Sequence, residues 1–173
     1  MATEPTIRIN RAPVLTLWGA VVAERMGHDR AAALTLGRAV AGLNAQSKGR
    51  RLGVFEESPT KTPKARRERL VSLLGRQVRT VKTSRGVRAV EKGKPTAPTS
   101  VERYLKEKFG DDLPEARSAM EALAKAYSPE DLEEIGFSLY EQFRPRIPEG
   151  ARGWGAKGTL DLGRVRQLAE RGR

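Results

Sequence analysis

The glycine-rich stretch GARGWGAKGT, residues 150–159, is the part of the sequence most similar to a phosphate-binding loop. That loop has two glycines separated by four residues, then lysine and serine or threonine directly, so that backbone amides surround the phosphates. Here one residue intrudes before Lys157 and another separates it from Thr159. We therefore expect a loop that reverses the chain, with Trp154 packed on the core. Contact of Arg152, Trp154 and Lys157 with nucleic acid is the alternative.

Carboxylates are the next candidates, because pairs of them can perform acid–base catalysis or bind a metal ion. They fall on predicted helix faces opposite the apolar residues, where solvated side chains belong. They are Glu121, Glu130, Asp131, Glu133, Glu134 and Glu141. We predict no catalytic site, no bound metal ion and no cofactor.

The chain has almost no residues for chemistry based on thiols or histidines. The sequence contains no cysteine and a single histidine, His28, so thiolate metal sites and histidine clusters are excluded. His28 lies beside a predicted helix cap, where a turn residue is a simpler role than a general base. Chemistry based on a Ser-Lys pair or on carboxylates stays open. The absence of cysteine fits a reducing compartment, and we expect a cytoplasmic protein.

Charge is distributed unevenly along the chain, whose total is +12. Residues 61–97 contain twelve basic and two acidic residues, a net charge of +10, whereas residues 98–149 carry a net charge of −5. Concentrated positive charge repels itself, and a polyanion relieves that repulsion while releasing its counterions. The sequence therefore predicts a nucleic-acid partner, with DNA as the expected form.

The predicted phosphate contacts all lie in this basic segment. They are Lys64, Arg66, Arg67, Arg69, Arg79, Lys82, Arg85 and Arg88. Such contacts position a protein on nucleic acid but carry little sequence information. Two other interpretations stay open. The segment could be a solvated basic region, as charge runs usually are, or one chain's basic segment could dock on the acidic helices of another, giving a homo-oligomer or a protein-interaction module.

Among the elements that position these residues, the first ten residues predict either a loose arm or a short strand over 6–10. Helices are predicted over 12–26 and 30–47, separated by Gly27 and an Asp29 cap. Small residues in the second helix allow close helix packing, so we predict a helical hairpin. Its first apolar run has features of a secretory signal, but the helical spacing continues past any cleavage point, which favours a core helix.

A helix-turn-helix is the other interpretation of this hairpin, because its small, turn and apolar residues have the expected spacing. The outward positions of the second helix would include Ala31 and Leu34. Neither side chain can form a hydrogen bond with a base edge. We therefore predict a hairpin that packs rather than one that recognises DNA.

In the basic segment, Thr62 and Pro63 predict the start of a helix that carries the apolar residues up to Leu74. Residues 77–90 then predict a β-hairpin that turns at 84–86. A basic helix followed by a hairpin resembles winged-helix domains, in which the helix enters the major groove and the wing contacts the backbone. The resemblance is limited to the order of elements.

Helices return after Pro98. A capping box of Thr99 with Glu102 predicts the first, Ser128 followed by Pro129 predicts the start of another, and Asp161 caps the last. The sequence thus predicts a mainly α-helical protein, with a bundle-like body of about five to six helices and a small β-hairpin insertion.

We predict one domain over residues 1–173 with three subregions. Residues 1–60 form an N-terminal helical hairpin, residues 61–97 a basic helix plus hairpin, and residues 98–173 the C-terminal helices.

Overall fold

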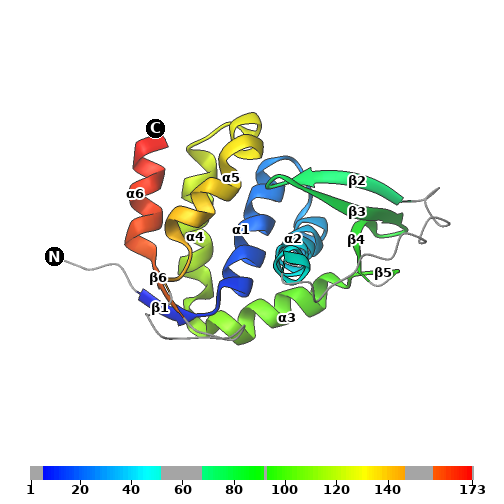
Figure 1. The fold of residues 1–173 in the computed structure, drawn as a ribbon, viewed down its shortest axis with the longest axis horizontal. Coiled ribbons are helices and arrows are strands. Elements are labelled where there is room, and N and C mark those ends of the chain that lie inside the picture. The colour runs from blue at the N-terminus through cyan, green and yellow to red at the C-terminus, as the bar shows by residue number, and fades with distance from the viewer. Residues whose placement is uncertain (1–5, 52–67, 92, 147–157, 173) are drawn as a thin grey trace.

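The computed structural model describes residues 6–51, 68–91, 93–146 and 158–172. It confirms a mainly α-helical fold with a small antiparallel sheet (Figure 1). In chain order the elements are β1 (Thr6–Ile9), α1 (Arg11–Arg25), α2 (Arg30–Arg51), β2 (Glu68–Leu73), β3 (Arg76–Thr83), β4 (Gly86–Glu91), β5 (Lys94–Pro95), α3 (Pro98–Phe109), the 3-10 turn η1 (Gly110–Asp112), α4 (Leu113–Lys125), α5 (Pro129–Phe143), β6 (Gly158–Asp161) and α6 (Leu162–Gly172).

Helix α1 is the centre of the core. Every residue from Pro13 to Ala23 is buried, and none of them is charged. Trp18 is fully buried and donates a hydrogen bond from Nε1 to the carbonyl oxygen of Gly136 in α5 at 3.0 Å. Its ring also meets Phe143 edge to face, with centroids 5.4 Å apart. The central helix is thereby joined to α5 by both apolar and polar contacts.

The predicted helical hairpin of α1 and α2 is confirmed, and its helices meet at glycines. A Cβ atom added to Gly37 would lie 2.2 Å from the carbonyl oxygen of Thr16. One added to Gly19 would lie 2.9 Å from the Cα atom of Gly37. The two backbones therefore touch directly, as short side chains permit. Gly27, with φ at 110°, ends the turn after α1, and Asp29 accepts a hydrogen bond from the Ala32 amide.

Two of the three predicted caps in the C-terminal half are confirmed. Ser128 Oγ accepts a hydrogen bond from the Asp131 amide at 3.1 Å, and Asp161 Oδ1 accepts one from the Gly163 amide at 2.9 Å. The predicted capping box at Thr99 is wrong. Helix α3 begins at Pro98 after Ala97, without a side-chain cap, because the first-turn proline places Thr99 inside the helix.

The sheet corrects the prediction for the segment before the hairpin. Strand order is β2-β3-β4-β5, all antiparallel, and residues 68–73, predicted as part of a helix, form a strand. Thr62 and Pro63 lie outside the described residues. The predicted hairpin at 84–86 is confirmed, since Thr83 pairs with Gly86. A helix directly before that hairpin is absent from the described part of this segment, so the winged-helix order is not observed there.

A tight turn explains why residues 68–73 form a strand. Leu73 pairs with Arg76 across Leu74 and Gly75, which both have positive φ, at 52° and 75°. A two-residue turn of this kind matches the twist of the flanking strands. Leu74 is only 2% exposed, and a Cβ atom on Gly136 would lie 2.5 Å from its Cδ2. The β2–β3 turn is thus fixed against α5.

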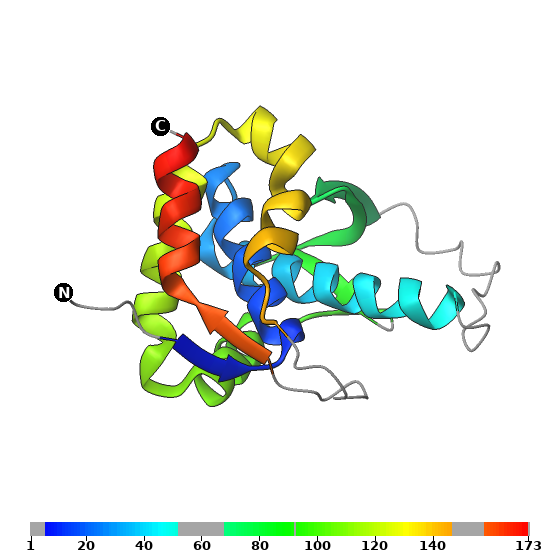
Figure 2. The same cartoon turned by 60° about the vertical axis from the view of Figure 1, so that its left-hand side comes forward.

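The predicted N-terminal strand is confirmed as β1, and it pairs with β6 (Figure 2). Ile7 lies opposite Leu160, and both side chains are buried. The buried apolar residues of this pair, of the larger sheet and of all six α-helices labelled in Figure 1 form one contiguous cluster in the described part of the chain.

Candidate nucleic-acid interface

The larger sheet lies on the side of α1 opposite α4 and α6 (Figures 1 and 2). Besides the Leu74 turn, a polar contact fixes it to the helices. The Thr35 hydroxyl donates a hydrogen bond to the Ala32 carbonyl at 2.8 Å and accepts one from the Ala89 amide at 3.0 Å. The ends of β2 and β3 away from the Leu74 turn extend outward from the helical body (Figure 1).

Four of the predicted phosphate contacts are exposed on this sheet. Arg69 lies on β2, Arg79 and Lys82 lie on β3, and Arg85 lies in the β3–β4 turn. Paired residues share a face of a sheet and neighbours alternate. Since Leu70 pairs with Arg79 while Arg69 pairs with Thr80, the basic side chains lie on both faces. The structure therefore brings together a two-sided basic ribbon rather than one flat patch.

Arg88 differs from these four residues. It is only 8% exposed, and its guanidinium donates hydrogen bonds to the carbonyl oxygens of Val87 at 2.8 Å and Arg85 at 3.2 Å. Its burial withdraws it from the outer surface of the ribbon. The remaining predicted contacts, Lys64, Arg66 and Arg67, lie outside the described residues.

Two side chains near the ribbon have positions that the sequence did not predict. Leu70 is 64% exposed and lies opposite Arg79, so an apolar side chain accompanies the charges. Arg76, although part of the basic segment, is held inward. Its Nη2 donates to Asn44 Oδ1 at 3.3 Å, and its guanidinium lies 5.7 Å from the Phe137 ring centroid. Exposure along β2 falls steadily from Arg69 and Leu70 to the buried Leu73, so strand alternation would not have indicated that Leu70 is exposed.

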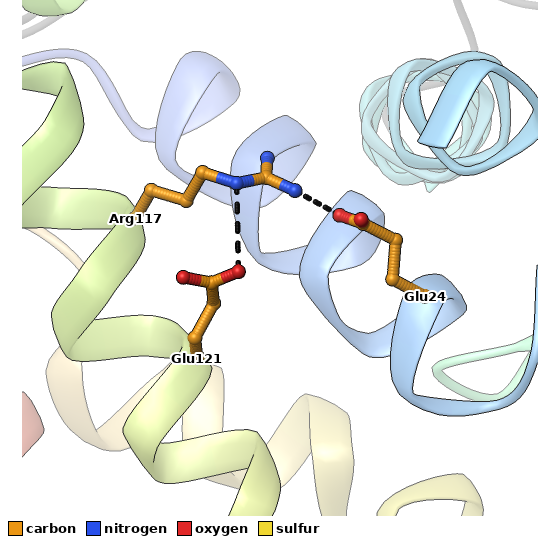
Figure 3. A network of polar contacts seen from close by, with 3 residues as sticks. All are labelled: Glu24, Arg117 and Glu121. Carbon is orange, nitrogen blue, oxygen red and sulfur yellow. Dashed lines mark hydrogen bonds and ion pairs between the residues drawn. The ribbon is translucent and has the colours of Figure 1, made fainter. Parts of the chain in front are cut away.

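The acidic side chains either form ion pairs or are exposed to solvent. Arg117 forms an ion pair with Glu24, and its Nε lies 3.7 Å from Glu121 Oε2, so one arginine joins α1 to α4 (Figure 3). The other predicted carboxylates are exposed, as expected from the apolar spacing. The described residues bring no three His, Asp or Glu side chains together in a way that could hold a metal ion.

Two tyrosines have perturbed acidity. Burial raises the pKa of Tyr140 to about 12, and its hydroxyl donates to the carbonyl oxygen of Arg11 at 3.4 Å. Burial also raises the pKa of Tyr104, whose ring lies 4.7 Å from the Arg38 guanidinium. Both hydroxyls therefore stay protonated at neutral pH.

Helix α5 has the opposite charge to the ribbon. It contains no lysine or arginine, and all five of its acidic side chains are exposed. These residues are Glu130, Asp131, Glu133, Glu134 and Glu141. The described part of the chain thus carries both an exposed basic ribbon and an exposed acidic helix.

No known protein family, curated protein or solved structure matches this chain. Within the described ranges, no helix is both long enough and apolar enough to cross a bilayer.

Proposed function

We propose that this protein is a non-catalytic nucleic-acid-binding protein, with DNA as the expected form, and that the β2–β4 ribbon contacts phosphates. The observation that carries this proposal is the exposure of Arg69, Arg79, Lys82 and Arg85 on strands that extend from the helical body. Residues 68–91 contain six basic residues and two acidic ones. A cytoplasmic location belongs to the same proposal, because a chain without cysteine suits a reducing compartment.

A two-sided basic ribbon has a physical reason to bind a duplex. The major groove of B-DNA admits a two-stranded β-ribbon, and phosphates line both of its edges. Among the described residues the outer end of the β2–β4 ribbon has two strands, since Lys82 and Thr83 of β3 pair only with Val87 and Gly86 of β4. Arg79 on one face and Lys82 on the other could then each meet a different backbone. Binding of this kind depends on released counterions, so its affinity falls steeply with salt.

Removal of the ribbon's charges is expected to reduce the salt dependence of binding. The variant carries Arg69→Ala, Arg79→Ala, Lys82→Ala and Arg85→Ala. Fluorescence anisotropy of labelled duplex DNA, single-stranded DNA and RNA, titrated across salt, should give a logarithmic slope shallower by about 3 to 4 than wild type, because each phosphate contact contributes about 0.9 on a duplex.

The matched control removes four exposed charges from elsewhere: Arg103→Ala, Lys106→Ala, Lys108→Ala and Lys125→Ala on α3 and α4. It has the same net charge as the ribbon variant and should keep most of the wild-type slope. Equal slopes for the two variants, or no binding by wild type near physiological salt, would contradict the proposal.

The acidic surface of α5 favours a second candidate, in which the ribbon of one copy docks on α5 of another. Sedimentation velocity without nucleic acid separates the two candidates. Self-association that disappears as the salt concentration rises would support the second candidate, docking of the ribbon on α5 of another copy. A monomer at every salt concentration would rule that candidate out.

A further inference from the structure

A pocket of about 600 Å³ lies where the start of α2, the β3–β4 turn and the segment leading into α3 meet. Its charged lining residues are Arg30, Arg85, Arg88 and Glu102. The lining thus includes three arginines and a single carboxylate residue. Glu102 also lies 3.5 Å from Lys106, which takes up part of its negative charge.

Arg88 is the unusual member of this pocket, because the residue as a whole is only 8% exposed. Its two bonding partners, the carbonyl oxygens of Val87 and Arg85, are neutral. No carboxylate of the described residues forms an ion pair with it. A guanidinium has five N–H donors, so Arg88 keeps donors for a ligand. A buried cation without a counterion is unfavourable, and an anion in the pocket would supply the missing charge.

The start of α3 adds a backbone donor to the arginine cluster. Ala97, Pro98 and Thr99 line the pocket, and α3 has no side-chain cap. The first amides of a helix lack partners inside the helix and favour anions. Pro98 has no N–H and the Ser100 amide already donates to the Ala97 carbonyl oxygen at 3.1 Å, so the Thr99 amide is the donor that the first turn of α3 offers. The start of α2, by contrast, is capped by the Asp29 carboxylate.

We propose that this pocket binds a phosphate monoester. A monoester carries nearly two negative charges at neutral pH, which matches three arginines against one carboxylate. The planar guanidinium also fits two phosphate oxygens at once. On a nucleic acid such a group occurs at a terminal 5′-phosphate, whereas an internal phosphodiester continues on both sides and has one charge. The other source is a free nucleotide.

The proposal shares Arg85 with the proposed function, so its test uses ligands that separate the two. Anisotropy compares single-stranded oligonucleotides of one sequence that carry a 5′-phosphate or a 5′-hydroxyl. Calorimetry compares AMP with adenosine. If nucleic acid is the source, wild type should bind the 5′-phosphorylated oligonucleotide about tenfold more tightly, as one additional charge-assisted contact predicts. If a free nucleotide is the source, wild type should bind AMP and not adenosine.

Two pocket variants test the residues. Arg88→Met keeps the volume of the buried side chain without its charge, and Arg30→Gln changes an exposed residue with little risk to folding. Each should bring the ratio of the affinity for the 5′-phosphorylated oligonucleotide to that for the 5′-hydroxyl oligonucleotide close to one. A double variant of the ribbon, Arg79→Ala with Lys82→Ala, keeps Arg85. It should lower the affinity for both oligonucleotides and leave the ratio of the two affinities unchanged.

The outcomes distinguish the two proposals. Equal affinities for the two oligonucleotides, together with no binding of AMP, would overturn the monoester site even if the ribbon binds nucleic acid. If a folded Arg30→Gln protein had the same ratio of the two oligonucleotide affinities as wild type, the monoester site would also be overturned. AMP binding without any oligonucleotide binding would keep the pocket and remove the proposed function.

Discussion

Replacing Gly37 with alanine is expected to lower the free energy of unfolding by about 3 kcal/mol or more, at the upper end for overpacked cores. The new Cβ atom would lie 2.2 Å from the Thr16 carbonyl oxygen and 2.7 Å from the Ala20 nitrogen. Both are backbone atoms of α1, so the clash can be relieved only by separating α1 from α2. Urea denaturation followed by far-UV circular dichroism measures the loss.

Gly42 provides the matched control, because it lies on the same helix and a Cβ atom there would meet nothing within 4 Å. Gly42→Ala should leave stability unchanged or raise it by up to about 1 kcal/mol, since alanine favours the helix. If the two alanine variants were equally stable, the direct backbone contact between α1 and α2 would be disproved.

Replacing Trp18 with alanine is expected to cost about 3 to 5 kcal/mol, the range for a large aromatic side chain deleted from a core. The substitution removes the edge-to-face contact with Phe143 and the hydrogen bond to Gly136. Trp18→Phe retains a ring but not the N–H donor, so it should cost less, about 1 to 2 kcal/mol.

The same denaturation experiment ranks wild type, Trp18→Phe and Trp18→Ala. A Trp154→Phe background leaves Trp18 as the single tryptophan, so its fluorescence reports burial directly. Solvent-exposed emission from the native state, or a loss below about 1 kcal/mol in Trp18→Ala, would contradict the central position of this side chain.

The helices could be predicted because their starts carry local signals. Ser128 and Asp161 occupy cap positions as expected, and apolar spacing predicted α1 close to its observed bounds. Strand β2 could not be predicted, since a short apolar run fits both helix and strand. The deciding feature is Leu74 in a left-handed conformation, which leucine rarely adopts and which depends on its contact with α5.

The candidate interface was predictable only in part. Exposure of Arg79 follows from local alternation and that of Arg85 from a turn, whereas Lys82 lies on the opposite face of β3 and is exposed near the outer end of the strand. The burial of Arg88 does not, because it depends on how the segment before α3 approaches the hairpin. Arg30 joins the pocket only through tertiary packing, since it comes far earlier in the sequence.

The pairing of β1 with β6 has a consequence for the kinetics of folding. It joins Ile7 to Leu160, so almost the whole chain must form a closed loop before their contact is made. Loop closure costs entropy before the contact stabilises anything, which favours late formation. A late contact acts mainly on the unfolding rate. In stopped-flow measurements, Ile7→Ala should therefore accelerate unfolding and barely alter refolding, so β1 and β6 determine how long the native state lasts rather than how quickly it forms.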